Sequence, residues 1–183
     1  MTKSDFDKFV ERQQAKIGEN EVFDPQLQLE DWEAALENLY EKISEYMNDY
    51  VKEEQAAITY RKVQLNEEFS GPYEAKEMLL KVGTSTITFT PVGTMLIGAK
   101  GRVDVTGTRG SARLVFMSRD IERASQMIKV TVEVVGQSSA AVDEPQTVQV
   151  DWTWKLATPP PNLRFIELDQ ESFFEMMLSI ADA

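Results

Sequence analysis

Residues 102–114 read RVDVTGTRGSARL, and this stretch decides the fold class. Apolar Val103 and Val105 alternate with polar neighbours up to the quartet Gly-Thr-Arg-Gly at residues 107–110, and another strand-like run follows. Two such runs joined by a glycine-containing turn predict an antiparallel hairpin with one buried face and one wet face.

The turn at residues 107–110 also predicts the register of this hairpin. Apolar residues meet apolar residues, and the Arg113 cation meets the Asp104 carboxylate, an exposed pair worth about 0.2–1 kcal/mol. The predicted partners are Thr106 with Ser111, Val105 with Ala112, Asp104 with Arg113 and Val103 with Leu114.

Similar alternation recurs in the middle and later parts of the chain. Because no strand–helix–strand alternation is present, a doubly wound parallel sheet is not expected. We expect an antiparallel meander of about seven strands. Further strand segments are Thr86–Thr90, Ile128–Val134, Val148–Leu156 and Leu163–Leu168.

Helical periodicity marks both ends of the chain. We expect a first helix from Ser4 to about Gly18 and a long second helix from about residue 26 to the mid-fifties. A last helix follows Asp169, whose side chain can cap it. These elements predict an α+β fold in which the two N-terminal helices and the C-terminal helix pack on one face of the sheet.

The length of 183 residues predicts one domain. Within residues 1–183 we expect a helical part at 1–55, an antiparallel sheet at 60–168 and the C-terminal helix at 169–182.

The second helix carries an apolar seam with alternating spacings of three and four residues. We expect the seam to pack on the protein's own sheet, because three heptads that include bulky aromatic residues suit a coiled coil poorly. The alternative is a homodimer in which the same helix of a second subunit covers it. The seam consists of Leu29, Trp32, Leu36, Leu39, Ile43, Tyr46 and Tyr50.

Composition excludes much familiar chemistry. The chain has no His and no Cys, so an imidazole base, a Ser–His–Asp triad, a thiolate nucleophile and Cys-based metal sites are excluded. No phosphate-loop, dinucleotide or EF-hand motif is present, and we expect no cofactor and no metal. The net charge of −12 argues against nucleic-acid and membrane partners, and we expect a cytoplasmic protein because no signal peptide begins the chain.

An acidic ridge follows the second helix at strict four-residue spacing. It is most simply a solvated face. The functional alternative is a docking surface for a basic protein partner, with charge steering the encounter. The ridge consists of Glu33, Glu37, Glu41, Glu45, Asp49 and Glu53.

Residues 98–129 carry seven bases and three acids, in contrast to the acidic ends of the chain. Two quartets of the form Gly-x-basic-Gly contain Lys100 and Arg109, and such glycine-rich loops can hold an anion on backbone N–H groups. The competing interpretation is a pair of hairpin turns with glycine at positive φ. We favour it, because successive turns of a meander lie at opposite ends of the sheet.

Trp152 and Trp154 share one face of a predicted strand. Two indoles in this arrangement can stack on a sugar or base, or they can fill the core between sheet and helices. Their alternation with Val148, Val150 and Leu156 favours core.

These features favour an acidic, non-enzymatic protein–protein interaction or regulatory module of the adaptor, chaperone-like or immunity/antitoxin kind. The alternative is a small-molecule binding protein or a carboxylate-dependent enzyme with a pocket between the long helix and the sheet.

Overall fold

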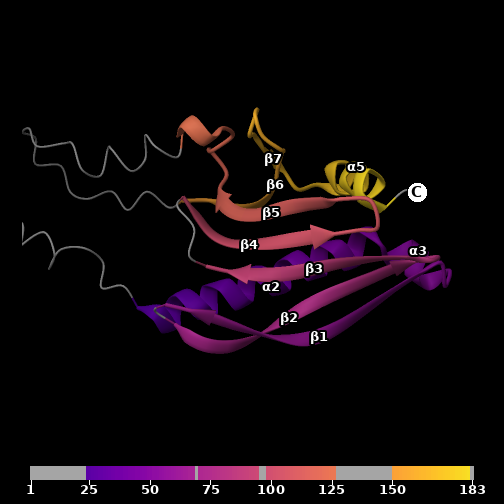
Figure 1. Ribbon diagram of the computed structural model, residues 1–183, viewed down its shortest axis with the longest axis horizontal. Coiled ribbons are helices and arrows are strands. Elements are labelled where there is room, and N and C mark those ends of the chain that lie inside the picture. Colours follow the sequence, from indigo (N-terminus) through magenta and orange to yellow (C-terminus); the bar gives the residue numbers. More distant parts are fainter. Residues whose placement is uncertain (1–23, 69, 95–97, 127–149, 182–183) are drawn as a thin grey trace, which may run out of the picture.

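The computed structural model describes residues 24–68, 70–94, 98–126 and 150–181 and contains a seven-stranded antiparallel sheet (Figure 1). The strands lie across the sheet in chain order, which confirms the α+β class and the meander. The expected helix Ser4–Gly18 and strand Ile128–Val134 lie outside the described residues. The strands are β1 (Ala56–Glu67), β2 (Gly71–Val82), β3 (Ser85–Gly93), β4 (Ala99–Thr106), β5 (Ser111–Ser118), β6 (Trp152–Ala157) and β7 (Phe165–Glu167).

The register predicted from the turn at residues 107–110 is confirmed. β4 and β5 pair with Val105 opposite Ala112 and with Asp104 opposite Arg113. Nε of Arg113 lies 3.7 Å from Oδ1 of Asp104, and Nη2 of Arg102 lies 2.6 Å from Oδ2 of the same carboxylate. Asp104 is therefore shared by two arginines on the same face of the hairpin.

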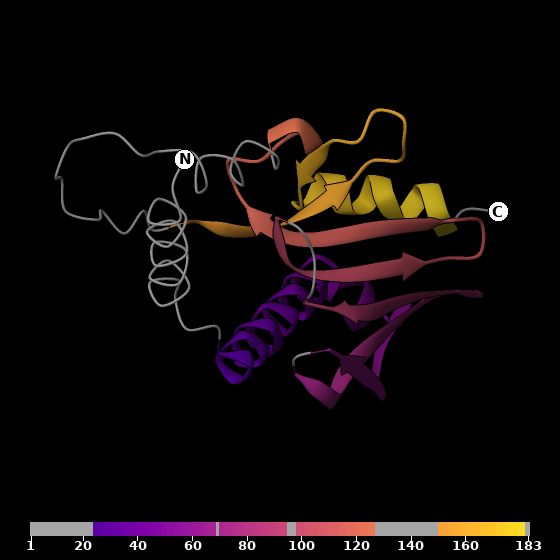
Figure 2. The same cartoon turned by 60° about the vertical axis from the view of Figure 1, so that its left-hand side comes forward.

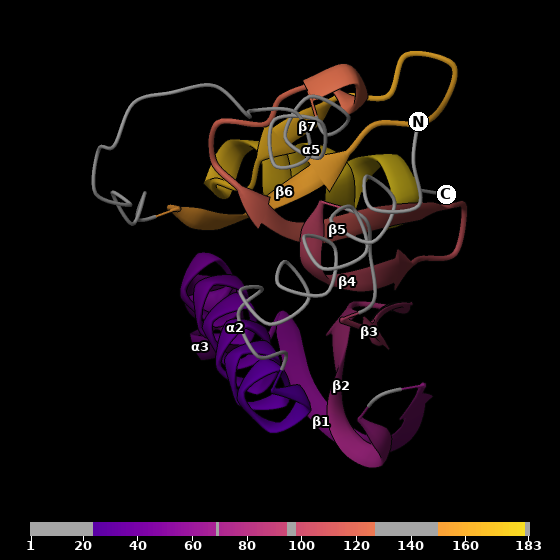
Figure 3. The same ribbon diagram turned by 90° about the vertical axis from the view of Figure 1, so that its left-hand side faces the viewer.

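Helices α2 (Pro25–Tyr46), α3 (Asn48–Lys52) and α5 (Gln170–Ala181) complete the described fold. The strands form an arc with α2 on its inner side (Figures 2 and 3). Side chains of α2 and α5 join those of β2 to β6 in one apolar core, so both helices cover the same sheet face. The middle of the seam packs on the chain's own sheet, with Trp32, Leu36, Leu39 and Ile43 no more than 4% exposed.

Asp169 caps α5 as expected. Its Oδ1 accepts the backbone N–H of Ser172 at 2.8 Å, and the Ser172 hydroxyl accepts the backbone N–H of Asp169 at 3.0 Å. This reciprocal arrangement satisfies donors at the helix start. The hydrogen bonds from Ser172 lower the pKa of Asp169.

The expected continuous helix to the mid-fifties is wrong at Met47. There α2 ends, and the five-residue α3 begins one residue later. The hydroxyl of Ser44 donates to the carbonyl of Tyr40 at 2.7 Å, a back-bonded arrangement that often bends helices. Met47 itself is buried at this bend.

Glu54, the second residue after α3, has a left-handed backbone, at φ 59°. Its N–H donates to the carbonyl of Val51, and the N–H of Gln55 donates to the carbonyl of Tyr50, which is the Schellman pattern. A non-glycine residue is strained there, so we expect Glu54→Gly to raise the free energy of unfolding by about 0.5–1 kcal/mol. Urea denaturation measures this. Glu53→Gly, at φ −84°, is the control and should be destabilising; a destabilised Glu54→Gly would contradict the prediction.

The expectation of positive φ at the paired glycines is correct for Gly98, at 75°, and wrong for Gly101, Gly107 and Gly110. Gly101 is not in a turn but inside β4. A Cβ there would overlap the ring of Trp32, and a Cβ at Gly107 would overlap the backbone carbonyl of Ile180. Gly101 therefore permits the close approach of α2, and Gly107 permits that of the end of α5.

The alternation in the sequence also predicted that one face of β6 is exposed to solvent, and this prediction is wrong. Thr153 and Lys155 are 4% and 2% exposed. A second, smaller core covers them on the sheet face away from the helices, since Ile121 and Phe165 pack there with Val115 and Met117 of β5. The segment after β5 supplies a cover that strand alternation cannot reveal.

Candidate functional site

Strands β2 and β3 form a fork. Residues 78–82 of β2 pair with β3, whereas residues 71–77 of β2 pair with β1 alone among the described strands. On its other side β3 stays paired with β4 as far as Gly93. The two strands therefore separate toward one end of the sheet (Figure 1).

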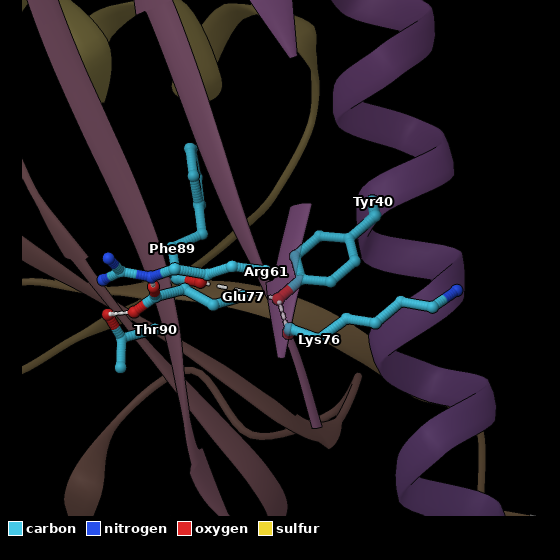
Figure 4. Close-up of polar contacts among 6 residues, drawn as sticks. All are labelled: Tyr40, Arg61, Lys76, Glu77, Phe89 and Thr90. Carbon is cyan, nitrogen blue, oxygen red and sulfur yellow. Dashed lines mark hydrogen bonds and ion pairs between the residues drawn. The ribbon is translucent and has the colours of Figure 1, made fainter. Parts of the chain in front are cut away.

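Polar side chains hold the base of this fork together (Figure 4). On the helix side, the Tyr40 hydroxyl donates to the backbone carbonyl of Lys76 at 2.6 Å. On the other side, Glu77 accepts from the Thr90 hydroxyl at 2.6 Å and from Nε of Arg61. Burial raises the pKa of Tyr40. Protein donors engage both carboxylate oxygens of Glu77, so its role here is structural.

A second carboxylate, Glu67, braces the open end of the fork. It accepts the backbone N–H and the hydroxyl of Thr94, the latter at 2.6 Å, and the hydroxyl of Tyr73. Burial, together with the Glu67 carboxylate, raises the pKa of Tyr73. Each carboxylate thus accepts from a threonine of the β3 side, and neither presents an open acid–base pair.

The structure places all six residues of the acidic ridge on exposed positions of α2, α3 and the residue that follows α3. Glu37 forms an ion pair with Lys76 at 2.9 Å. Within the described part of the chain, Glu41, Glu45, Asp49 and Glu53 form no ion pair. Glu33 forms none there either, so four of the ridge's five unpaired carboxylates lie in its C-terminal part, from Glu41 to Glu53.

An apolar groove lies beside that part of the ridge. It encloses about 430 Å³ between α3 and α5, over the β2–β3 turn. The rings of Tyr50 and Phe174 meet edge to face at a centroid distance of 6.1 Å. Leu178 is 68% exposed at the groove, and Tyr50 and Val82 are 43% and 37% exposed. The groove residues are Met47, Tyr50, Val82, Ser85, Ile87, Phe174, Met177, Leu178 and Ala181.

Between α2 and the β1–β2 ribbon the structure has a smaller hollow of about 280 Å³. Two ion pairs lie along it, Lys76 with Glu37 and Lys62 with Glu74. Five of its seven lining residues are charged, and four of these neutralise one another in the two ion pairs, with Glu33 as the fifth. This is where a pocket between the long helix and the sheet was expected.

The two tryptophans of β6 differ in their surroundings. Trp154 is 1% exposed, and its Nε1 donates to the carbonyl of Ala35 in α2 at 2.9 Å. Trp152 is partly exposed, with Nζ of Lys100 at 4.7 Å from its ring centroid. Phe116 contacts both rings. Trp154 therefore belongs to the core, and Trp152 lies at its edge under a lysine.

Lys100 and Arg109 lie at opposite ends of β4 and do not form one site. Lys100 forms an ion pair with Asp31 at 3.3 Å. At the other end, the backbone N–H of Arg109 donates to the carbonyl of Ile180, and the Thr108 hydroxyl donates to that of Ala181. This turn caps the C-terminus of α5, so an N–H that an anion would need is occupied.

Sequence patterns did not reveal the groove or the polar fork, because each joins residues from distant segments. The sequence feature that could have indicated the groove is the apolar face of the last helix, which includes Leu178, a residue that the structure leaves exposed.

Among the described residues, no group of three or more carboxylates is arranged to hold a metal ion, and no described helix combines the length and apolarity needed to cross a membrane. Comparisons with protein-family models, curated proteins and solved structures find no match to this chain.

Proposed function

We propose that this protein is a protein–protein interaction module whose groove between α3 and α5 binds an amphipathic segment of a basic partner. The observation that carries the proposal is an open apolar groove at the end of an acidic ridge. Exposed apolar surface of this kind, rimmed by charged residues, is typical of protein interaction sites. The residues expected to bind the apolar face are Tyr50, Phe174 and Leu178.

The charged residues around the groove indicate the charge of the partner. The helices that form its walls, with the end of α3, carry five carboxylates and one ammonium, that of Lys52. A basic flank on the partner would be attracted to this rim and to the ridge beyond it. The five acidic residues are Asp49, Glu53, Glu54, Glu171 and Glu175.

The same charges argue against a second copy of the chain as the occupant. Self-association through this groove would bring two acidic rims together in a protein of net charge −12. Like charges facing each other across an interface disfavour it. The homodimer expected as an alternative therefore has no support at this surface.

A designed peptide tests the proposal directly. The probe is an 18-residue helical peptide of Leu and Lys with an apolar stripe, labelled for fluorescence anisotropy and compared with the same pattern of Leu and Glu. We expect the Leu/Lys peptide to bind and the Leu/Glu peptide to bind at least tenfold more weakly. Raising the salt concentration should weaken the Leu/Lys complex, since surface charge is screened.

Variants locate the binding site. We expect Leu178→Ser to weaken binding about tenfold, because it removes an apolar anchor worth roughly 1.5 kcal/mol or more. Leu27→Ser is the matched control, since Leu27 is also a helical leucine, 57% exposed, but lies outside the groove. Equal effects of the two substitutions, or equal affinity for both peptides, would refute the proposed site.

A further inference from the structure

A cationic hollow lies on the opposite side of the sheet from α2. It encloses about 390 Å³ between the segment that follows β5 and strand β7. Three of the chain's eight arginines line it, although the protein carries a net charge of −12. These are Arg119, Arg123 and Arg164, and the buried Lys155 lines it with them.

Arg123 and Arg164 face one another. They are partners in an isolated antiparallel bridge, so their side chains leave the backbone on the same side, with Cβ atoms about 5 Å apart. Both residues also line a neighbouring hollow of about 350 Å³, so they lie at the boundary between the two hollows. Two guanidinium groups at this separation can reach one ligand group.

Hydrogen bonds hold the backbone of both arginines in place. The Gln126 side-chain carbonyl accepts the N–H of Arg123 at 2.7 Å. The Thr158 hydroxyl accepts the N–H of Arg164 at 2.8 Å, and the Thr158 N–H donates to the carbonyl of Arg164 at 2.9 Å. A binding site with a fixed backbone loses less entropy when its ligand is held.

The charges of Arg123 and Arg164 lack compensation within the described residues. Neither forms an ion pair there, whereas Arg119 pairs with Asp151 at 2.9 Å and with Glu167 at 3.4 Å. Like charges directly opposite on neighbouring strands are destabilising. A bound anion would relieve this repulsion.

Lys155 adds a buried cation to the wall of the hollow. Its Nζ donates to the carbonyls of Arg119 and Ile121, at 2.5 and 2.7 Å. Burial lowers the pKa of Lys155, while the nearby carboxylates oppose that shift, Glu167 most strongly. The lining also includes the carboxylates of Glu122 and Glu167. Because Arg119 is paired with Asp151 and Glu167, the lining cations that face solvent and form no ion pair in the described part of the chain are Arg123 and Arg164.

We propose that this hollow binds a small phosphate ester, with the phosphate held between the guanidinium groups of Arg123 and Arg164. Paired N–H donors of a guanidinium match phosphate oxygens two at a time. Ile166, which is 46% exposed, lines the same hollow and offers an apolar surface to the body of the ester, whereas Phe165 packs in the second core. The site is separate from the groove between α3 and α5, and its test does not depend on that groove.

The experiment is isothermal titration calorimetry of the full chain with phenyl phosphate, inorganic phosphate and succinate, each at matched ionic strength. We expect phenyl phosphate to bind most tightly, followed by inorganic phosphate. Arg123→Gln and Arg164→Gln should each weaken phenyl phosphate at least tenfold. Arg164→Lys, which keeps the charge but not the paired donors, should also weaken it.

Arg109→Gln is the matched control, since Arg109 is an exposed arginine of a turn outside this hollow. The affinity of this variant for phenyl phosphate should equal that of the unsubstituted chain. Far-UV circular dichroism checks that each variant folds. Absence of binding to the unsubstituted chain, unchanged affinity in both glutamine variants, or an equal loss in Arg109→Gln would overturn the proposal. Tighter binding of succinate than of either phosphate would overturn the assigned ligand class.

Discussion

Replacing Arg61 by Met is expected to lower the free energy of unfolding by about 3 kcal/mol, the low end of the range for breaking a buried ion pair from one side. The side chain of Glu77 is 3% exposed, whereas that of Arg61 is 60% exposed. Without Arg61, the carboxylate keeps the Thr90 hydroxyl as its donor but loses its opposite charge. The cost arises because a buried charge is left without a counter-charge.

The reverse substitution removes the same ion pair at a much smaller cost. In Glu77→Gln the amide can still accept from Thr90, and water can solvate the exposed Arg61, so we expect a loss of about 1 kcal/mol. The double variant should be more stable than Arg61→Met alone. Urea denaturation followed by tryptophan fluorescence measures the free energy of unfolding of all three variants. Lys62→Met, which breaks the exposed Lys62–Glu74 pair, is the control, and we expect it to change the free energy of unfolding by no more than about 0.5 kcal/mol. Equal losses for the two single variants would disprove the asymmetry.

Period-two patterning predicted the sheet best where both faces of a strand have constant surroundings. β4 is such a strand, and its register against β5 from Val103 to Thr106 was predictable residue by residue. The capped start of α5 was also predictable, because Asp169 acts on its own helix. Each of these features depends on residues close in sequence.

The long β1–β2 ribbon was not predictable in the same way. Burial along β2 changes phase, with Tyr73, Ala75 and Glu77 buried before the fork and Met78 and Leu80 buried after it. The strand changes its surroundings where it leaves β3, so a single alternation cannot describe it. Glu77 is polar and buried for the same reason, since its donors come from other strands.

The candidate sites show the same limit. The acidic ridge was visible in the sequence because helical spacing alone generates it, but its ion pair between Glu37 and Lys76 depends on β2. The positive charge of residues 98–129 was also visible, yet Lys100 and Arg109 lie apart. The arginines that meet, Arg123 and Arg164, are 41 positions apart and are joined by a bridge that no local pattern encodes.

Gly101→Ala is expected to lower the free energy of unfolding by about 2–3 kcal/mol, the cost of overpacking a dense core. Gly101 lies inside β4, where α2 approaches the sheet, and a Cβ there would overlap Cζ3 and Cε3 of Trp32. Trp32 is 1% exposed and packs against Trp154 at a ring-centroid distance of 6.1 Å, so its ring cannot move aside freely. The new methyl group must therefore displace α2 from the sheet.

Two variants separate this overlap from a general effect of replacing glycine. In Gly110→Ala the nearest atom to the new Cβ is Cγ2 of Ile180, at an ordinary 3.8 Å, and we expect a change within about 0.5 kcal/mol. Trp32→Phe removes the overlapping ring atoms, so Gly101→Ala should cost less than about 1 kcal/mol in that background. Urea denaturation of the four combinations at positions 32 and 101 gives the coupling energy. A coupling near zero would mean that Trp32 does not exclude a side chain from position 101.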